Sequence, residues 1–175
     1  MCIRDRVNAA RKGQLVLLVG GLNDLPEPAS RLLALLGDKT IHAGPVGSGA
    51  ALKVAVNVMS YAQFSAAAAA HHVLATTGTD PEGLVEAWRH IGQLGRLTEA
   101  FVGLLSLPED VVMGDMRSYL MTTAAIAHKD LTLAEEMATD GTELQALLQS
   151  LRDAVPEVFR VKNMALDDHE GGGHG

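Results

Sequence analysis

The strongest structural signal in the chain lies in residues 44–77, which read GPVGSGAALKVAVNVMSYAQFSAAAAAHHVLATT. From Ala50 to Thr77 there is no glycine or proline, and alanine is the commonest residue. This composition predicts one long helix, roughly 40 Å in length. Because apolar residues go most of the way round that helix, we expect it to be buried on several sides, in a core or between subunits.

A short α/β unit is predicted before the long helix. Gln14–Gly21 is an apolar run closed by two glycines, which is typical of a buried strand. A leucine-rich helix should follow, capped by Asn23 or Asp24 and ending at Gly37, and a second strand is expected over residues 40–43. A single strand–helix–strand unit is too little sheet to stand alone as a domain, which agrees with a longer natural protein.

The rest of the chain is predicted to be helical. Asp80-Pro81 should open a helix that continues to Ile91, and another is expected over residues 94–105. Apolar residues at three- and four-residue steps from Leu120 to Ala138 predict a long amphipathic helix. Thr142 and Gln145 form a capping-box pattern before the last helix. The predicted fold class is mostly α, with a trailing βαβ piece and one long central helix.

Composition excludes several classes of protein. The 175 residues are 47% apolar and 20% charged, as in an ordinary globular protein. A net charge of -7 and an aromatic content of 3% argue against nucleic acid as a partner. The only cysteine, Cys2, excludes a disulfide framework and a thiolate zinc site. Polar residues within Ala50–Ala75 argue against a membrane span, and we predict a cytoplasmic protein with no membrane partner.

The two ends of the chain are interpreted separately. Residues 1–6, Met-Cys-Ile-Arg-Asp-Arg, lack the apolar core of a signal peptide. Their codons can be written so that they resemble the end of a transposase adapter used in DNA library preparation. We therefore interpret residues 1–6 as a non-native leader, the alternative being a native N-terminal segment. Residues 166–175 are acidic and glycine-rich and are predicted to be disordered.

Glycines and two polar residues mark the start of the long helix. Gly44, Gly47 and Gly49 are not spaced as in the G-x-G-x-x-G dinucleotide fingerprint. They form either a simple turn or a surface where backbone N–H groups accept an anion. Lys53 and Asn57 lie four residues apart, and therefore on one helix face. Burial lowers the pKa of a lysine toward neutrality, as general acid–base catalysis requires, whereas the alternative is a snorkelling lysine beside a helix-bonding asparagine.

Two pairs of adjacent polar residues were considered as further sites. Lys129 and Asp130 point about 100° apart on a helix, so a solvated charge pair is the default interpretation. His71 and His72 are also adjacent rather than four residues apart, which is not the spacing of helical metal ligands. We therefore predict no metal site.

Three segments in order resemble the β-hydroxyacid dehydrogenases, the group that includes 3-hydroxyisobutyrate dehydrogenase and tartronate semialdehyde reductase. Gly44 to Asn57 is similar to the family signature G-x-x-G-x-G-x-x-x-K-x-x-x-N. His128-Lys129-Asp130-Leu131-x-Leu133-Ala134 is similar to the later K-D-L-x-L-A segment, and Gly13–Gly21 fits the G-x-L-x-x-x-V-G-G strand. The resemblance covers residues 7–160 and favours the functional interpretation of these residues.

The resemblance implies a domain organisation and an activity. Residues 7–45 would be the C-terminal remnant of an NAD(P)-binding Rossmann domain, and residues 46–165 an all-helical dehydrogenase domain. The implied reaction interconverts a small 3-hydroxy acid and its semialdehyde by hydride transfer, with NAD or NADP as cofactor. The implied protein is a homodimer or homotetramer.

The resemblance also implies roles for individual residues. Lys53 would be the catalytic acid/base. Substrate binding would involve Asn57, Gly47, Gly49 and Asp130, of which Asp130 also holds the local geometry. Lys129 would contact the cofactor.

The chain departs from the family pattern in several places. The cofactor fingerprint and an S-G-G substrate segment are expected before residue 7, so we predict that these 175 residues alone do not catalyse the reaction. Many members carry two asparagines where this chain has Val56-Asn57, and an aromatic residue where it has Thr122. The alternatives are a noncatalytic helical dimerisation module, and a related sugar-acid dehydrogenase or imine reductase.

Overall fold

A computed structural model describes residues 9–162 of the chain. The predicted leader at residues 1–6, the predicted disordered tail at 166–175 and the last three residues of the predicted helical domain lie outside the described residues. The chain divides into two compact units, an N-terminal unit of residues 1–105 and a C-terminal unit of residues 106–175. The predicted domain boundary at residues 45 and 46 stays a prediction.

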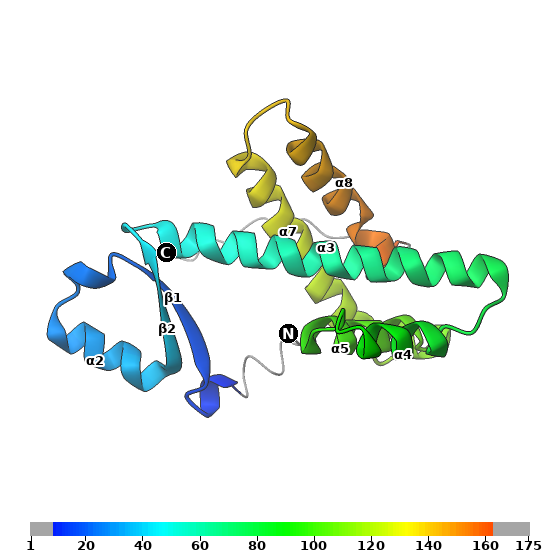
Figure 1. Ribbon diagram of the computed structural model, residues 1–175, viewed down its shortest axis with the longest axis horizontal. Helices are drawn as coiled ribbons and strands as arrows, with labels where there is room; N and C mark the ends of the chain where they lie inside the picture. The colour runs from blue at the N-terminus through cyan, green and yellow to red at the C-terminus, as the bar shows by residue number, and fades with distance from the viewer. Residues whose placement is uncertain (1–8, 163–175) are drawn as a thin grey trace. The chain divides into compact units, whose positions relative to one another are not determined.

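The N-terminal unit begins with a parallel strand–helix–strand motif (Figure 1). Strand β1 and strand β2 pair with Leu17 opposite Thr40 and Leu18 opposite Ile41. Helix α2 joins them, as a parallel pair requires a crossover connection. The bounds are β1 Leu15–Gly20, the 3-10 helix η1 Leu22–Asp24, α2 Glu27–Leu36 and β2 Gly37–Gly44.

Three local expectations for this motif were wrong. Asn23 and Asp24 lie in η1 and do not cap α2, whose N-cap is Pro26. The fixed φ of Pro26 and of Pro28 pre-sets the chain for a helix start, so no side-chain cap is needed there. Strand β2 begins at Gly37 rather than at residue 40, and β1 is half-buried rather than buried, since Val16 is 57% exposed.

The long helix is confirmed as one uninterrupted element, α3 Ser48–Thr77 (Figure 1). Gly78 ends it in a left-handed conformation with its N–H bonded to the Leu74 carbonyl. The expectation of burial on several sides is not met within this chain, and burial between subunits stays a prediction. The buried residues lie on a single face at three- and four-residue steps, and they are Asn57, Tyr61, Phe64 and Ala67. Val56, Met59 and Val73 are exposed on other parts of the surface.

Two shorter helices, α4 Glu82–His90 and α5 Arg96–Leu105, complete the N-terminal unit. As predicted, Asp80 stabilises the start of α4, because its Oδ1 accepts the Glu82 N–H at 2.9 Å. Helix α5 packs on α3 through stacked rings of Phe64 and Phe101, whose centroids lie 4.3 Å apart. This contact fixes the rotation of α3 just after Asn57.

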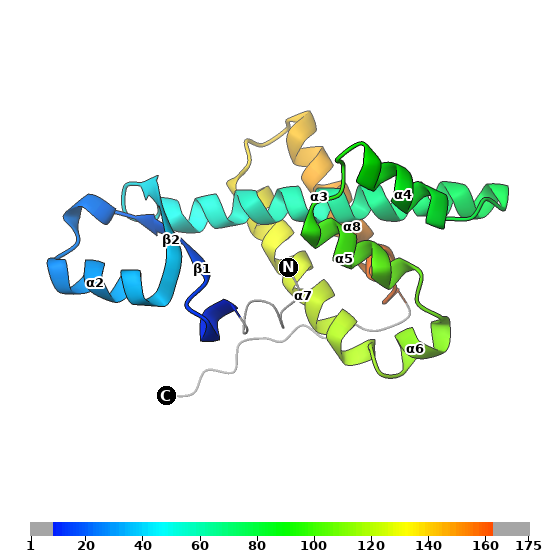
Figure 2. The same cartoon turned by 60° about the horizontal axis from the view of Figure 1, so that its bottom comes forward.

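The described part of the C-terminal unit, residues 106–162, contains helices and turns but no strand. Its helices are α6 Glu109–Met113, which was not predicted, α7 Arg117–Met137 and α8 Glu143–Val158 (Figure 2). The predicted apolar stripe of α7 is confirmed as its buried face for Leu120, Ala124, Ala127, Leu131 and Ala134, whereas Ala138 is the C-cap after the helix. The capping interaction is also confirmed, since the Gln145 N–H donates to Thr142 Oγ1 at 3.1 Å. Arg152 of α8 forms an ion pair with Glu135 of α7.

Within the described residues, none of the helices is both long enough and apolar enough to cross a membrane.

Candidate functional site

The Lys53 ammonium and the Asn57 side chain form a hydrogen-bonded pair on α3. Lys53 Nζ donates to Asn57 Oδ1 at 2.7 Å. Lys53 is partly buried, and Asn57 is buried with only 7% of its surface exposed. The four-residue spacing in the sequence therefore places the two groups in direct contact, as expected for neighbours one helical turn apart.

Helix α3 carries no acidic residue and no second lysine or arginine near Lys53. From Ser48 to Thr77 the chain contains no Asp, Glu or Arg and no second Lys. One turn after Lys53, on the same face, lies the Asn57 amide, whose Oδ1 accepts a hydrogen bond from the ammonium.

The glycine turn before α3 combines two different requirements. Gly47, the N-cap of α3, has φ +92°, and a Cβ built on it would meet nothing within 4 Å. A Cβ on Gly49 would lie 2.5 Å from the carbonyl oxygen of Leu18 in β1. Gly49 therefore lets the helix start pack directly on the strand, while Gly47 supplies a left-handed turn that is open on its outer side.

Lys129 and Asp130 form a second pair, within the C-terminal unit. Lys129 Nζ lies 2.8 Å from Asp130 Oδ1, and the side chains are 72% and 12% exposed respectively. The default interpretation of a solvated charge pair was wrong for Asp130, because its side chain is buried. The two charged groups still meet, although the residues are adjacent on the helix, because the lysine side chain is long enough to reach the carboxylate. The result is a buried carboxylate whose partner ammonium stands at the surface.

The predicted site residues therefore fall into two clusters, each formed inside its own unit. Lys53, Asn57, Gly47 and Gly49 belong to the first turns of α3 in the N-terminal unit. Lys129 and Asp130 belong to α7 in the C-terminal unit.

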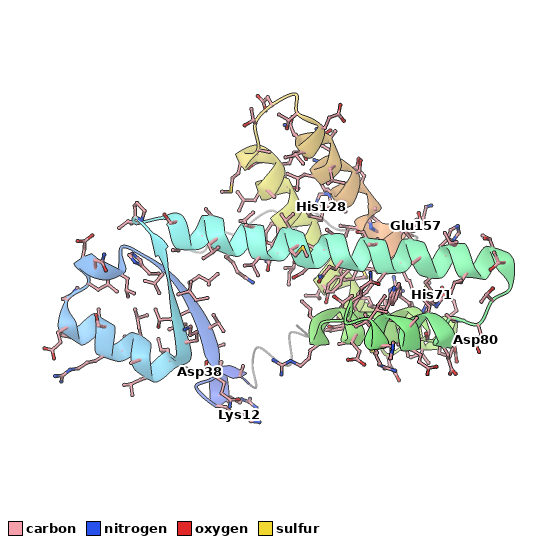
Figure 3. All side chains as sticks on the ribbon, in the orientation of Figure 1. Lys12, Asp38, His71, Asp80, His128 and Glu157 are labelled. Atoms are coloured by element: carbon pink, nitrogen blue, oxygen red, sulfur yellow. The ribbon has the colours of Figure 1, made fainter. Side chains whose placement is uncertain are left out.

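The histidines of α3 do not form a metal centre in the part of the chain that the structure describes. Residues 9–162 contain no group of three or more His, Cys, Asp or Glu side chains placed to hold a metal ion. Figure 3 shows His71 on the side of α3 that lies toward α4 and α5. Its buried Nε2 has no hydrogen-bond partner among the described residues. Sequence inspection missed this buried atom, although His71 continues the buried face four residues after Ala67.

Known proteins were compared with the chain at the level of sequence and of structure. No protein-family model matches. An uncharacterized oxidoreductase of Mycobacterium tuberculosis is 32% identical over an alignment of 155 residues, which covers 82% of this chain and 50% of the relative. Human mitochondrial 3-hydroxyisobutyrate dehydrogenase is 27% identical over 162 residues, which are 93% of this chain and 48% of the relative. The chain therefore spans about half the length of the curated relatives it matches.

A solved structure has the same fold over the matched part. Mycobacterium tuberculosis 3-hydroxyisobutyrate dehydrogenase with L-serine aligns with a TM-score of 0.62 and 23% identity. The alignment covers 86% of this chain and 52% of that protein. The mostly α architecture of the chain is thus a known dehydrogenase fold, and the relatives by sequence are named as oxidoreductases and 3-hydroxyisobutyrate dehydrogenases. The resemblance of the chain to the β-hydroxyacid dehydrogenases is thus confirmed over most of its residues, which match about half the length of those relatives.

Proposed function

We propose that the chain supplies the acid–base and substrate-binding side of an NAD- or NADP-dependent dehydrogenase. The reaction interconverts a small 3-hydroxy acid and its semialdehyde. The single observation that carries the proposal is the 2.7 Å hydrogen bond between Lys53 Nζ and Asn57 Oδ1. It lies one and a half turns after the open glycine turn at Gly47, where a small ligand can approach the backbone.

Lys53 is the proton-transferring group in this proposal. In oxidation, the hydroxyl proton of the substrate passes to the lysine amine as the hydrogen on the same carbon leaves as hydride. In reduction, the Lys53 ammonium donates a proton to the aldehyde oxygen as the carbon receives the hydride. The positive charge stabilises the negative charge that develops on that oxygen. Bound nicotinamide is the hydride donor or acceptor.

Asn57 orients both partners of the proton transfer. Its Oδ1 accepts from Lys53 Nζ and so holds the ammonium, and in this proposal the same side-chain amide also contacts a substrate oxygen. Carboxylate, hydroxyl and aldehyde oxygens are all acceptors. The pair is therefore suited to a substrate that presents two oxygens to the start of α3.

Lys129 is the residue proposed to contact the cofactor, and its environment fits that role. Its side chain is 72% exposed even though it pairs with Asp130, so the ammonium is accessible to the ribose or phosphate oxygens of a dinucleotide. Asp130 holds the Lys129 ammonium from a buried position, and in this proposal it also binds the substrate. The choice between NAD and NADP is left open in this proposal.

The relatives support the substrate class. Several are named for 3-hydroxyisobutyrate, and the solved mycobacterial relative was determined with L-serine, which is itself a 3-hydroxy acid. As further parts of the proposal, the whole protein is a homodimer or homotetramer and works in the cytoplasm. The chain by itself is proposed to lack turnover.

The binding half of the proposal can be tested on the 175-residue chain. In a ¹H–¹⁵N NMR titration with 3-hydroxy-2-methylpropanoate, the signals of Gly47 and of the Asn57 side-chain amide should shift and saturate. Lys53→Met should weaken binding by about tenfold or more, the size expected for losing one charge-assisted hydrogen bond. His72→Ala, an exposed residue of the same helix with no assigned role, is the control. Equal binding by wild type and Lys53→Met would contradict the proposal.

A second candidate is a helical dimerisation module, favoured by the apolar residues that α3 leaves exposed. Val56, Met59 and Val73 are 47%, 60% and 60% exposed. Sedimentation of the chain and of Val73→Asp separates the two functions. A dimer that dissociates in Val73→Asp, together with no response to hydroxy acids, would favour the module over the enzyme.

A further inference from the structure

Tyr61 is a buried aromatic residue one helical turn after Asn57 on α3. It follows Asn57 by four residues, and the two residues are 8% and 7% exposed. Side chains of a helix lean toward its N-terminus and cover the turn that precedes their own Cα. The Tyr61 ring therefore extends over the turn that carries Asn57, just as the Asn57 side chain extends toward Lys53 and accepts its hydrogen bond.

The Tyr61 ring is itself held by aromatic residues of two helices. It packs edge-on against Phe64, with ring centroids 6.2 Å apart and an interplanar angle of 71°. Phe64 in turn stacks on Phe101 of α5, and both of these residues are buried. Aromatic pairs in these two geometries stabilise beyond the area that they bury. The position of the Tyr61 ring is thus fixed by packing between α3 and α5 and not by α3 alone.

We propose that Tyr61 is a positioning residue that holds the Asn57 amide in the orientation that bonds Lys53. The inference rests on the proposed function, in which Lys53 and Asn57 bind the substrate oxygens. The terminal torsion of an asparagine side chain is broad, so its covalent structure does not select the orientation in which Oδ1 faces the ammonium. A ring packed over the amide restricts this torsion before the substrate arrives, and preorganisation of this kind increases affinity.

The contact between the ring and the amide can be measured in the wild-type chain. Nuclear Overhauser effects between the Tyr61 ring protons and the Asn57 side-chain amide protons are expected in the NMR spectra of the labelled 175-residue chain. This measurement does not require any variant to fold. Absence of these effects, with both groups of signals assigned, would overturn the inference.

Tyr61→Leu and Tyr61→Phe separate the ring from the hydroxyl. Leucine is apolar but lacks the ring, so the Asn57 amide signals should move. The affinity for 3-hydroxy-2-methylpropanoate should fall by about three- to tenfold, the size expected when one more side chain has to be ordered on binding. Phenylalanine keeps the ring and should retain the amide signals and an affinity within about twofold of the wild type.

Val102→Ala is the control for lost packing. It truncates a buried side chain of α5 that is not part of the aromatic contact to Tyr61. The variant should therefore leave the Asn57 amide signals in place and the affinity within about twofold of the wild type.

The outcomes distinguish this inference from the proposed function. If Lys53→Met weakens binding but Tyr61→Leu does not, or if Tyr61→Phe or Val102→Ala weakens it as much as Tyr61→Leu does, the inference is overturned and the proposed function stands. If the wild type does not bind the acid, or Lys53→Met binds it equally well, the proposed function fails and the inference fails with it. Weaker binding in Tyr61→Leu alone supports the inference. A Tyr61→Leu protein that does not fold leaves the decision to the wild-type Overhauser effects.

Discussion

Lys53 Nζ lies 2.7 Å from Asn57 Oδ1, one helical turn farther along α3. The bond joins a partly buried cation to a buried amide on a helix whose neighbouring positions are almost entirely apolar. Buried polar groups are costly unless they are bonded, so the pair is mutually dependent.

Asn57→Leu tests this dependence through stability. Leucine has a similar volume but cannot accept the Lys53 hydrogen bond, so the free energy of unfolding should fall by about 1–3 kcal/mol. Asn57→Asp retains an acceptor and adds an opposite charge, and should stay within about 1 kcal/mol of the wild type. Urea unfolding followed by circular dichroism measures both. An Asn57→Leu protein as stable as the wild type would show that the bond contributes nothing.

Gly49→Ala and Gly83→Ala should have opposite effects. A Cβ on Gly49 would lie 2.5 Å from the Leu18 carbonyl oxygen, a backbone atom that cannot move aside without disturbing β1. We expect a loss of about 1–3 kcal/mol in the free energy of unfolding. Gly83, inside α4, has nothing within 4 Å of a new Cβ, and alanine there should stabilise by about 0.5–1 kcal/mol. Thermal unfolding that shows the same sign for both variants would contradict the close packing of α3 on β1.

His71→Leu should stabilise the N-terminal unit. The buried Nε2 of His71 has no hydrogen-bond partner among residues 9–162, and an unsatisfied buried polar atom costs free energy. Leucine keeps most of the volume and removes that atom, so the melting temperature should rise by a few degrees, corresponding to about 1 kcal/mol. His72→Leu, at an exposed neighbouring position, is the control and should change little. A lower melting temperature for His71→Leu would contradict this account and would mean that the imidazole makes a stabilising hydrogen bond.

The two members of the Lys129–Asp130 pair should differ in their importance for stability. Lys129 is largely exposed, so Lys129→Met should change the free energy of unfolding by less than about 1 kcal/mol. Asp130 is buried, and Asp130→Ala removes a side chain from the packed surface of α7 and should cost about 1–3 kcal/mol. Urea unfolding of the two variants gives the comparison. Equal losses would argue that Lys129 holds the structure rather than being accessible to a ligand.

Much of the helical architecture could be predicted from the sequence because its signals are local. The absence of glycine and proline between Ala50 and Thr77 predicted α3, and the spacing of Thr142 and Gln145 predicted the cap of α8. The placement of Lys53 and Asn57 on one helix face followed from their four-residue spacing, whereas the hydrogen bond between them was not predicted. Such features depend on the geometry of one helix and not on what surrounds it.

The failures share a different cause, since they depend on which neighbour covers a surface. Composition could not show that only one face of α3 is buried, because alanine and valine are compatible with either environment. The start of α2 was misplaced because Pro26 and Asp24 are both good signals for a helix start and the chain uses the proline. The burial of Asp130 beside an exposed Lys129 could likewise not be predicted from two adjacent residues in the sequence.

The central claim, that Lys53 transfers the proton, is tested most directly by turnover in a chimera. Residues 9–162 would be joined to the half of mycobacterial 3-hydroxyisobutyrate dehydrogenase that lies outside the matched region. Oxidation of 3-hydroxy-2-methylpropanoate would be followed as reduction of the nicotinamide cofactor. Lys53→Ala should lower kcat by about 10²- to 10⁴-fold, the usual contribution of a general acid–base, while His72→Ala leaves it unchanged. An active chimera whose kcat falls less than about twofold in Lys53→Ala would contradict the assignment.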